Sequence, residues 1–134
     1  MNGFAFPVRV YWEDTDAGGI VFYANYLKFF ERARTEWLRS LGIEQRRLRE
    51  ATGGMFIVGE TSVRYLRPAR LDDELLVTAE LEAAGRASLI IAQRALLRAG
   101  GAALAEGTIR IGWVDAATLR PARIPTEILQ ALNR

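Results

Sequence analysis

Two reactive residue types are missing from this chain of 134 residues, which has neither cysteine nor histidine. The lack of cysteine excludes disulfides and thiolate nucleophiles, and the lack of both types excludes the zinc sites that they build. Every catalytic triad whose base is an imidazole is excluded as well. Any catalysis by this chain must therefore rest on carboxylates or on backbone dipoles.

Targeting and membrane-spanning segments are also missing from the sequence. The start, "MNGFAFPVRVYWED", has no basic region followed by an apolar one, and no uncharged apolar run is long enough to cross a bilayer. We therefore expect a cytoplasmic protein with no integral membrane segment.

Neither sign of charge is in large excess, since 18 basic residues face 16 acidic ones and the net charge is only +2. Lys28 is the one lysine, so the basic residues are almost all arginine. Arginine suits bidentate phosphate contacts, but we favour an explanation by genome composition. With so small a net charge we expect no nucleic-acid partner.

Apolar residues make up half of the chain, which is enough for one sizeable core, and we predict a single domain over residues 1–134. Apolar and polar residues alternate from Pro7 to Trp12, which predicts a strand, and apolar residues then recur at helical spacing from Tyr26 until Gly42. Further strands are predicted near 55–66, 74–83, 87–98 and 103–114, with a short helix in "RIPTEILQALNR".

Short breaks between these strands favour antiparallel neighbours. The predicted fold is therefore an α+β domain with a long helix on one face of a twisted five-stranded antiparallel sheet and a short C-terminal helix. Such a sheet has edges that an identical subunit could cover.

The segment "WEDTDAGGIVFYANY" crowds carboxylates beside glycines and apolar residues. In one interpretation it is a solvated turn, in which Asp14 or Asp16 caps the following helix. In the other, the strand delivers Asp16 to an apolar neighbourhood formed by residues 20–23. A poorly hydrated carboxylate there would be a stronger base or nucleophile.

The stretch "VRVYWEDTDAGGIVFYANYLKFFERARTEWLRSLG" resembles the N-terminal signature of hotdog-fold acyl-CoA thioesterases, the 4-hydroxybenzoyl-CoA thioesterase and YbgC-like group. The likeness continues through "YLRPARLDDEL" and "GRASLIIAQRALL" and covers most of the chain. Its motif, D-x-D-x-x-G-[IV]-V followed by two aromatic or His positions and A/P-N/S-Y, is long and position-specific. The resemblance therefore favours the second interpretation of the acidic segment.

This resemblance implies a hotdog fold, in which the twisted sheet wraps the long helix, two subunits join their sheets, and acyl-CoA lies along their interface. It implies that Asp16 is the catalytic carboxylate, acting as a nucleophile or as a general base for water, and that Asp14 is structural. It also places an oxyanion-stabilising N–H at a helix start before the second strand, here around Gly54, Met55 and Phe56.

Met55, Phe56 and the remaining candidate residues are expected to bind substrate. Arg86 and Ser88, in "GRAS", resemble the turn of the family that meets the CoA phosphates, although a hairpin turn that merely exposes its arginine explains the same residues. We expect Tyr23 to line the acyl pocket. The resemblance implies no metal and no cofactor, because coenzyme A is part of the substrate.

Two departures from the YbgC-like pattern stand in the motif. Tyr23 occupies the position where those proteins usually have His, as in the 4-hydroxybenzoyl-CoA enzyme, and Trp12 stands where they often have Tyr. The first departure removes a proposed proton-transfer partner. The mechanism must then work with Asp16 and hydrogen-bond donors, or the activity on aliphatic thioesters is weak.

The predicted function is hydrolysis of a short-chain aliphatic or aromatic acyl-CoA to a carboxylic acid and CoA by a homodimer or homotetramer. Acyl carrier protein could replace CoA as the thiol carrier. The alternative is a hotdog protein that binds acyl thioesters, or a partner in the cell envelope, without turning them over. A hotdog dehydratase is less favoured, because those enzymes have a catalytic His.

Overall fold

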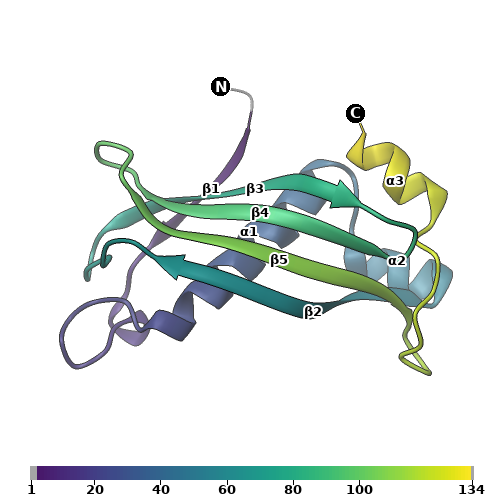
Figure 1. The fold of residues 1–134 in the computed structure, drawn as a ribbon, viewed down its shortest axis with the longest axis horizontal. Helices are drawn as coiled ribbons and strands as arrows, with labels where there is room; N and C mark the ends of the chain where they lie inside the picture. The colour runs from purple at the N-terminus through teal and green to yellow at the C-terminus, as the bar shows by residue number, and fades with distance from the viewer. Residues whose placement is uncertain (1–2, 134) are drawn as a thin grey trace.

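A five-stranded antiparallel sheet with one long helix across one face makes up the fold (Figure 1). The structure, a computed structural model, describes residues 3–133. The sheet has the order β1-β3-β4-β5-β2, so β1 and β2 are its edges. Its strands are β1 (Phe4–Arg9), β2 (Gly54–Tyr65), β3 (Glu74–Ala84), β4 (Ser88–Leu97) and β5 (Ala103–Asp115). The helices are α1 (Tyr26–Ser40), α2 (Gln45–Thr52) and α3 (Thr126–Leu132). The predicted α+β architecture is confirmed.

The core lies between α1 and the sheet, because α1 is apolar on the stripe that faces the strands. Phe29, Phe30 and Ala33 are fully buried there. Burying a side chain the size of phenylalanine contributes about 1.5–3 kcal/mol. Gly107 of β5 makes room for this packing, since a Cβ at that position would lie 3.0 Å from Cε2 of Phe30.

The edge strand β1 differs from its prediction, because it begins at Phe4 and ends at Arg9 rather than running from Pro7 to Trp12. Pro7 is tolerated because β1 is an edge strand, which needs ladder hydrogen bonds on one side only. After Val10 the chain turns into the short 3₁₀ helix η1 (Trp12–Asp14). The alternating residues beyond Arg9 therefore do not extend the strand.

Helix α2 was not predicted, because its sequence "QRRLREAT" has little apolar periodicity and no residue of the helix is fully buried. It follows α1 closely after the left-handed Gly42, with φ of +82°, which ends α1 as predicted. Gly53, with φ of +75°, caps its C-terminus and leads directly into β2.

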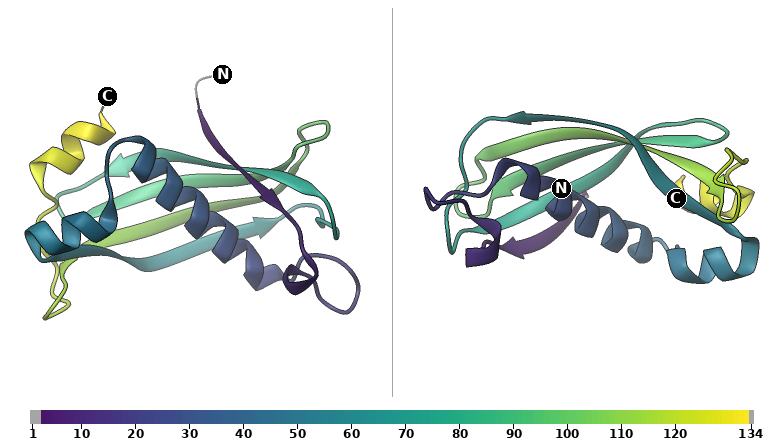
Figure 2. Two further views of the ribbon diagram at one scale, coloured as in Figure 1. Left: turned by 180° about the vertical axis from the view of Figure 1, so that it is seen from behind. Right: turned by 90° about the horizontal axis from the view of Figure 1, so that it is seen from below.

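The two ends of the molecule carry different elements (Figure 2). The loop between β1 and α1 lies at one end, beside the start of α1, whereas α2 and α3 lie at the other. Within residues 3–133, none of the helices combines the length and the apolar character needed to span a bilayer.

Candidate active site

Asp14 is the buried member of the acidic segment, with only 5% of its surface exposed. The backbone N–H of Tyr11 donates to its Oδ2 at 2.8 Å, and Nδ2 of Asn25 donates to its Oδ1 at 2.7 Å. Its backbone carbonyl accepts the N–H of Phe22 at 2.9 Å. Asp14 therefore joins the end of β1 to the start of α1, which is the structural position that the family resemblance implied.

Asp16, the predicted catalytic residue, lies two residues further on and is exposed. The N–H of Gly18 donates to its Oδ1 at 2.8 Å, and its own N–H donates to the carbonyl of Ile20 at 2.9 Å. Gly19, with φ of +78°, supplies the left-handed turn that closes this loop. The carboxylate is thus held in a local turn, and within residues 3–133 its other oxygen accepts no hydrogen bond.

The helix-capping interpretation of the acidic segment is wrong for both carboxylates. The residue before α1 is Asn25, and no side chain caps the helix there. Asp14 and Asp16 accept backbone N–H groups of Tyr11 and Gly18, which lie outside α1.

The apolar wall predicted around Asp16 is incomplete in the single chain. Val21 turns its side chain into the core, while Phe22 and Tyr23 are 47% and 63% exposed. Asp16 therefore meets water in one subunit, and the expected desolvation of its carboxylate is not supplied by this chain alone.

An aromatic cluster of Phe22, Tyr23 and Tyr65 forms the exposed surface at the start of α1. The ring centroids are 4.9 Å apart for Phe22 and Tyr23, and 6.1 Å apart for Tyr23 and Tyr65. The hydroxyl of Tyr65 donates to the carbonyl of Tyr23 at 3.0 Å. Tyr65 was not predicted as a site residue. Its position at the end of a strand that returns to the helix start is a tertiary feature, which no local motif records.

Behind the cluster, Tyr26 is buried and its hydroxyl accepts the N–H of Ala69 at 3.3 Å. Burial disfavours the charged phenolate and raises the pKa of Tyr26, although the hydrogen bond from Ala69 acts in the opposite direction. The pKa of Tyr65 is raised in the same way, mainly by partial burial.

The loop that holds Asp16 leads into the 3₁₀ turn η2 (Tyr23–Asn25), which continues directly into α1. Within residues 3–133, the backbone N–H groups of Tyr23 and Ala24 have no hydrogen-bond acceptor. These are orphan donors of the kind found at every helix start, and the helix dipole adds positive potential there.

The predicted oxyanion segment around Gly54, Met55 and Phe56 is not at a helix start, which corrects the prediction. It follows the C-terminus of α2, where the dipole is negative, and the N–H of Gly54 already donates to Oγ1 of Thr52 at 3.1 Å. Phe56 packs edge-to-face on Trp113, with ring centroids 4.9 Å apart.

Four predicted substrate-binding residues lie together at the end of the sheet opposite Asp16 and Tyr23. Gly112 of β5 pairs with Ser88 on one side and with Ile57 on the other. The turn that contains Arg86 therefore lies at the same end of the sheet as the start of β2, which carries Met55 and Phe56. The carbonyl of Arg86 accepts the N–H of Ile124, and its side chain is exposed. Phe56 and Met55 lie nine and ten residues before Tyr65, which bonds to Tyr23, so at about 3.3 Å per residue the two groups stand roughly 30 Å apart along one chain.

A groove runs between α1 and the free edge of β2, because α1 does not cover this strand. This groove has a volume of about 330 Å³. It is lined by Leu27, Lys28, Glu31, Arg34, Val58, Thr61 and Ile109. Val58 is 52% exposed at its rim. Among residues 3–133, no three carboxylates converge to hold a metal ion.

Comparison with known proteins places this architecture among hotdog-fold thioesterases. Residues 10–132 match the model of the thioesterase-like superfamily. The chain is 42% identical to the acyl-CoA thioesterase YbgC of Haemophilus influenzae over 98% of its own length and 96% of that protein.

Solved structures agree. A probable thioesterase from Bartonella henselae has a TM-score of 0.82 and 32% identity, over 90% of this chain and 98% of that one. The 1,4-dihydroxy-2-naphthoyl-CoA thioesterase Slr0204 from Synechocystis shares the fold with a TM-score of 0.90, at 20% identity over 98% and 96% of the two chains. The chain belongs to the thioesterase-like superfamily.

Proposed function

We propose that this protein is an acyl-CoA thioesterase that hydrolyses a CoA thioester to a free carboxylic acid and CoA, with Asp16 as nucleophile or general base. The observation that carries the proposal is an exposed carboxylate in the loop that leads into a helix start, where the N–H groups of Tyr23 and Ala24 have no acceptor within residues 3–133. Membership of the superfamily and the 42% identity to an acyl-CoA thioesterase support it.

One aspartate suffices because a thioester is an activated substrate. Its carbonyl is electrophilic and the thiolate leaves readily, so the site chiefly needs to position the ester and stabilise the developing oxyanion. A single oxyanion donor contributes about 2.7–4 kcal/mol in other enzymes. The N–H groups of Tyr23 and Ala24 would provide such donors without an imidazole, and no cofactor is required.

The active unit would be a homodimer in which the β2 strands of two subunits pair antiparallel along their free edges. A two-fold axis at the middle of β2 would set Gly54 to Phe56 of the partner subunit beside residues 63–65 of the first chain. Tyr65 holds Tyr23 by its hydrogen bond, so this arrangement would unite the two halves of the predicted site. The aromatic cluster and Asp16 would then be shielded from water.

Arg86 and Ser88 would meet the CoA phosphates at the mouth of this composite site. Arginine suits the task because its guanidinium donates in pairs to phosphate oxygens. The exposed side chain of Arg86 is available for such contacts. Acyl carrier protein remains an alternative thiol carrier, and a cytoplasmic location stays a prediction.

Thiol release from acetyl-, butyryl-, hexanoyl-, palmitoyl- and aromatic CoA esters tests the proposal. We expect turnover of at least one short-chain or aromatic ester by the wild type and loss of that turnover in Asp16→Asn. If the wild type releases thiol from none of these esters, the same panel on acyl carrier protein is the next step. Inactivity on both panels would exclude the proposed hydrolase.

The second candidate is a protein that binds acyl thioesters without hydrolysing them, alone or with a cell-envelope partner. Tyr23 favours it, because this position has no imidazole and the chain has no other histidine. Tight binding of acyl-CoA in calorimetry, without thiol release, would select this function.

A further inference from the structure

Arg34 of α1 is a buried charge for which the described part of the chain offers no carboxylate partner. Only 8% of its surface is exposed, and among residues 3–133 it belongs to none of the ion pairs. Its Nη1 donates to Oε1 of Gln93 at 3.0 Å, and Gln93 is fixed by the carbonyls of Phe30 and Thr78. Buried charges are normally paired, because leaving water is costly for an unpaired ion.

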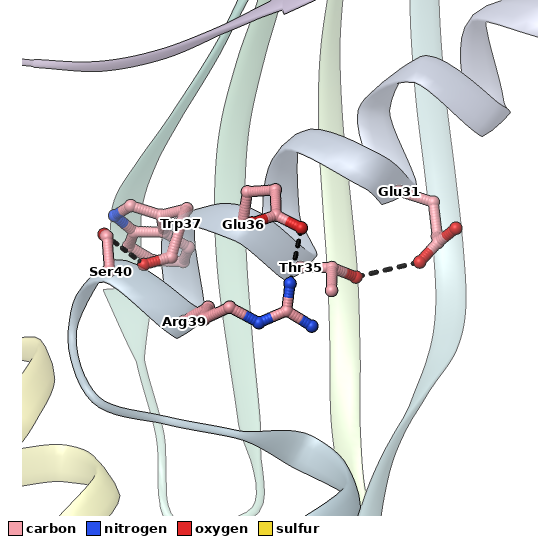
Figure 3. A network of polar contacts seen from close by, with 6 residues as sticks. All are labelled: Glu31, Thr35, Glu36, Trp37, Arg39 and Ser40. Atoms are coloured by element: carbon pink, nitrogen blue, oxygen red, sulfur yellow. Dashed lines mark hydrogen bonds and ion pairs between the residues drawn. The ribbon is translucent and has the colours of Figure 1, made fainter.

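The nearest opposite charge on the same helix is Glu31, one turn earlier. Its Oε2 accepts the hydroxyl of Thr35 at 2.9 Å, as Figure 3 shows, and its carboxylate is exposed at the groove beside β2. Burial lowers the pKa of Arg34, while Glu31 acts against that shift. Both charges therefore face the groove, and neither is neutralised by direct contact with the other.

The order of these two charges along α1 is self-complementary. Two copies of a helix related by a perpendicular two-fold axis run antiparallel. If that axis passes midway between Glu31 and Arg34, Glu31 of each copy lies opposite Arg34 of the other. Val58 and Thr61 line the groove beside this pair and flank the middle of β2. One axis can therefore serve both the helix pair and the strand pair.

We propose that the groove between α1 and β2 is closed by a second copy of this chain, in which Glu31 of each subunit pairs with Arg34 of the other. This inference rests on the dimer of the proposed function and names the charges that set its register. The partner's carboxylate supplies the missing counter-ion of Arg34. The half-exposed Val58 and Leu27 become covered at the same time.

Mixing two charge-reversed variants tests this pairing. Glu31→Lys and Arg34→Glu should each weaken their own homodimers at least tenfold in Kd, because like charges then meet across the axis. In an equal mixture both contacts become attractive, so native mass spectrometry should show mainly heterodimers. A pair acting only within one chain would gain nothing from mixing.

The matched control is Glu36 with Arg39, an ion pair of the same spacing on α1 (Figure 3), neither of which lines the groove. Glu36→Lys mixed with Arg39→Glu should give the statistical ratio of dimers. The same ratio for the Glu31 and Arg34 variants would overturn the inference.

Because Arg34 is buried, Arg34→Glu must first be shown to fold by circular dichroism. If it does not fold, Glu31→Lys is compared with Glu36→Lys, and an equal dimer Kd in these two exposed variants overturns the inference. If the wild type is an active dimer but the charge variants do not change its Kd, this inference fails and the proposed function stands. A wild type that is monomeric at all concentrations contradicts the assembly itself.

Discussion

At the scale of single residues, two aspartates separated by one threonine have opposite environments. Asp14 is buried and both of its carboxylate oxygens accept hydrogen bonds, whereas Asp16 is exposed and uses one oxygen in a turn. A carboxylate with all of its hydrogen bonds made within the protein stabilises the fold, and one with a free oxygen can attack or deprotonate. The same type of side chain thus has a structural role at position 14 and, in the proposed function, a catalytic role at position 16.

Replacing Asp16 by Asn should abolish catalysis and leave the fold unchanged. The amide keeps an oxygen for the N–H of Gly18 but loses basicity and nucleophilicity. We expect kcat to fall by about 10²–10⁴-fold, the usual contribution of general-base catalysis, or further if Asp16 is the nucleophile. The measurement is thiol release under saturating substrate. The exposed neighbour Glu13, changed to Gln, should retain full activity.

Asp14→Asn should lower the free energy of unfolding. In Asp14→Asn one oxygen becomes an NH₂ group, which must face a donor, either the N–H of Tyr11 or Nδ2 of Asn25. Leaving a buried donor unsatisfied costs about 1–3 kcal/mol, measurable by urea unfolding. Asp16→Asn, as the matched control, should change the free energy of unfolding by less than about 0.5 kcal/mol. Equal stabilities of the two variants would contradict the structural role of Asp14.

At the scale of elements, the pattern of apolar residues predicted β2 to β5 to within one or two residues, since each strand carries its own alternation and ends in a turn. The pattern failed to predict the secondary structure where tertiary contacts determine it. Asp73 and Asp14 accept the N–H groups of Val10 and Tyr11 and so redirect the chain after β1, and α2 contributes few apolar residues to the core. Neither effect leaves a periodic signal.

The start of β2 depends on a glycine. A Cβ at Gly54 would lie 2.4 Å from Cζ2 and 2.5 Å from Cε2 of Trp113, whose indole fills this space. Gly54→Ala should therefore lower the free energy of unfolding by about 1–3 kcal/mol, the usual cost of overpacking.

Gly85→Ala is the control for this change, because a Cβ there meets only ordinary contacts at 3.6 Å. It should be neutral or slightly stabilising. Chemical unfolding of both variants at one protein concentration separates the two cases. An unchanged stability of Gly54→Ala would mean that Trp113 moves aside without cost.

At the scale of the whole molecule, the candidate site is divided between the two ends of one sheet. Asp16 and Tyr23 could be named as candidates from the sequence because they lie in a long motif, and Arg86 and Ser88 because they lie in a recognisable turn. Their separation along β2 was not predictable, because it depends on which strand is the free edge. Tyr65 and Arg34 were missed for the same reason, since their partners are distant in sequence.

Stability of the whole fold should fall in alkali through Tyr26. In the unfolded chain a tyrosine loses its proton near pH 10, whereas burial raises the pKa of Tyr26 in the folded protein. The unfolded state therefore releases the proton first. The contribution of the protonated Tyr26 to the free energy of unfolding is complete below about pH 10. It is lost as the pH rises through the pKa of Tyr26 in the folded protein, and the free energy of unfolding then falls by up to about 1.4 kcal/mol per pH unit.

Urea unfolding of wild type and Tyr26→Phe between pH 8 and about pH 11 tests this linkage, at a fixed protein concentration because the proposed dimerisation would also contribute to stability. The variant should be less stable at pH 8 by about 0.5–1.5 kcal/mol, since the N–H of Ala69 loses its acceptor. Its stability should then fall less steeply above pH 10. The exposed Tyr11, changed to Phe, should follow the wild-type curve. Parallel curves for wild type and Tyr26→Phe would mean that the folded protein accommodates the Tyr26 phenolate as easily as the unfolded chain does, so that another group controls the alkaline limit.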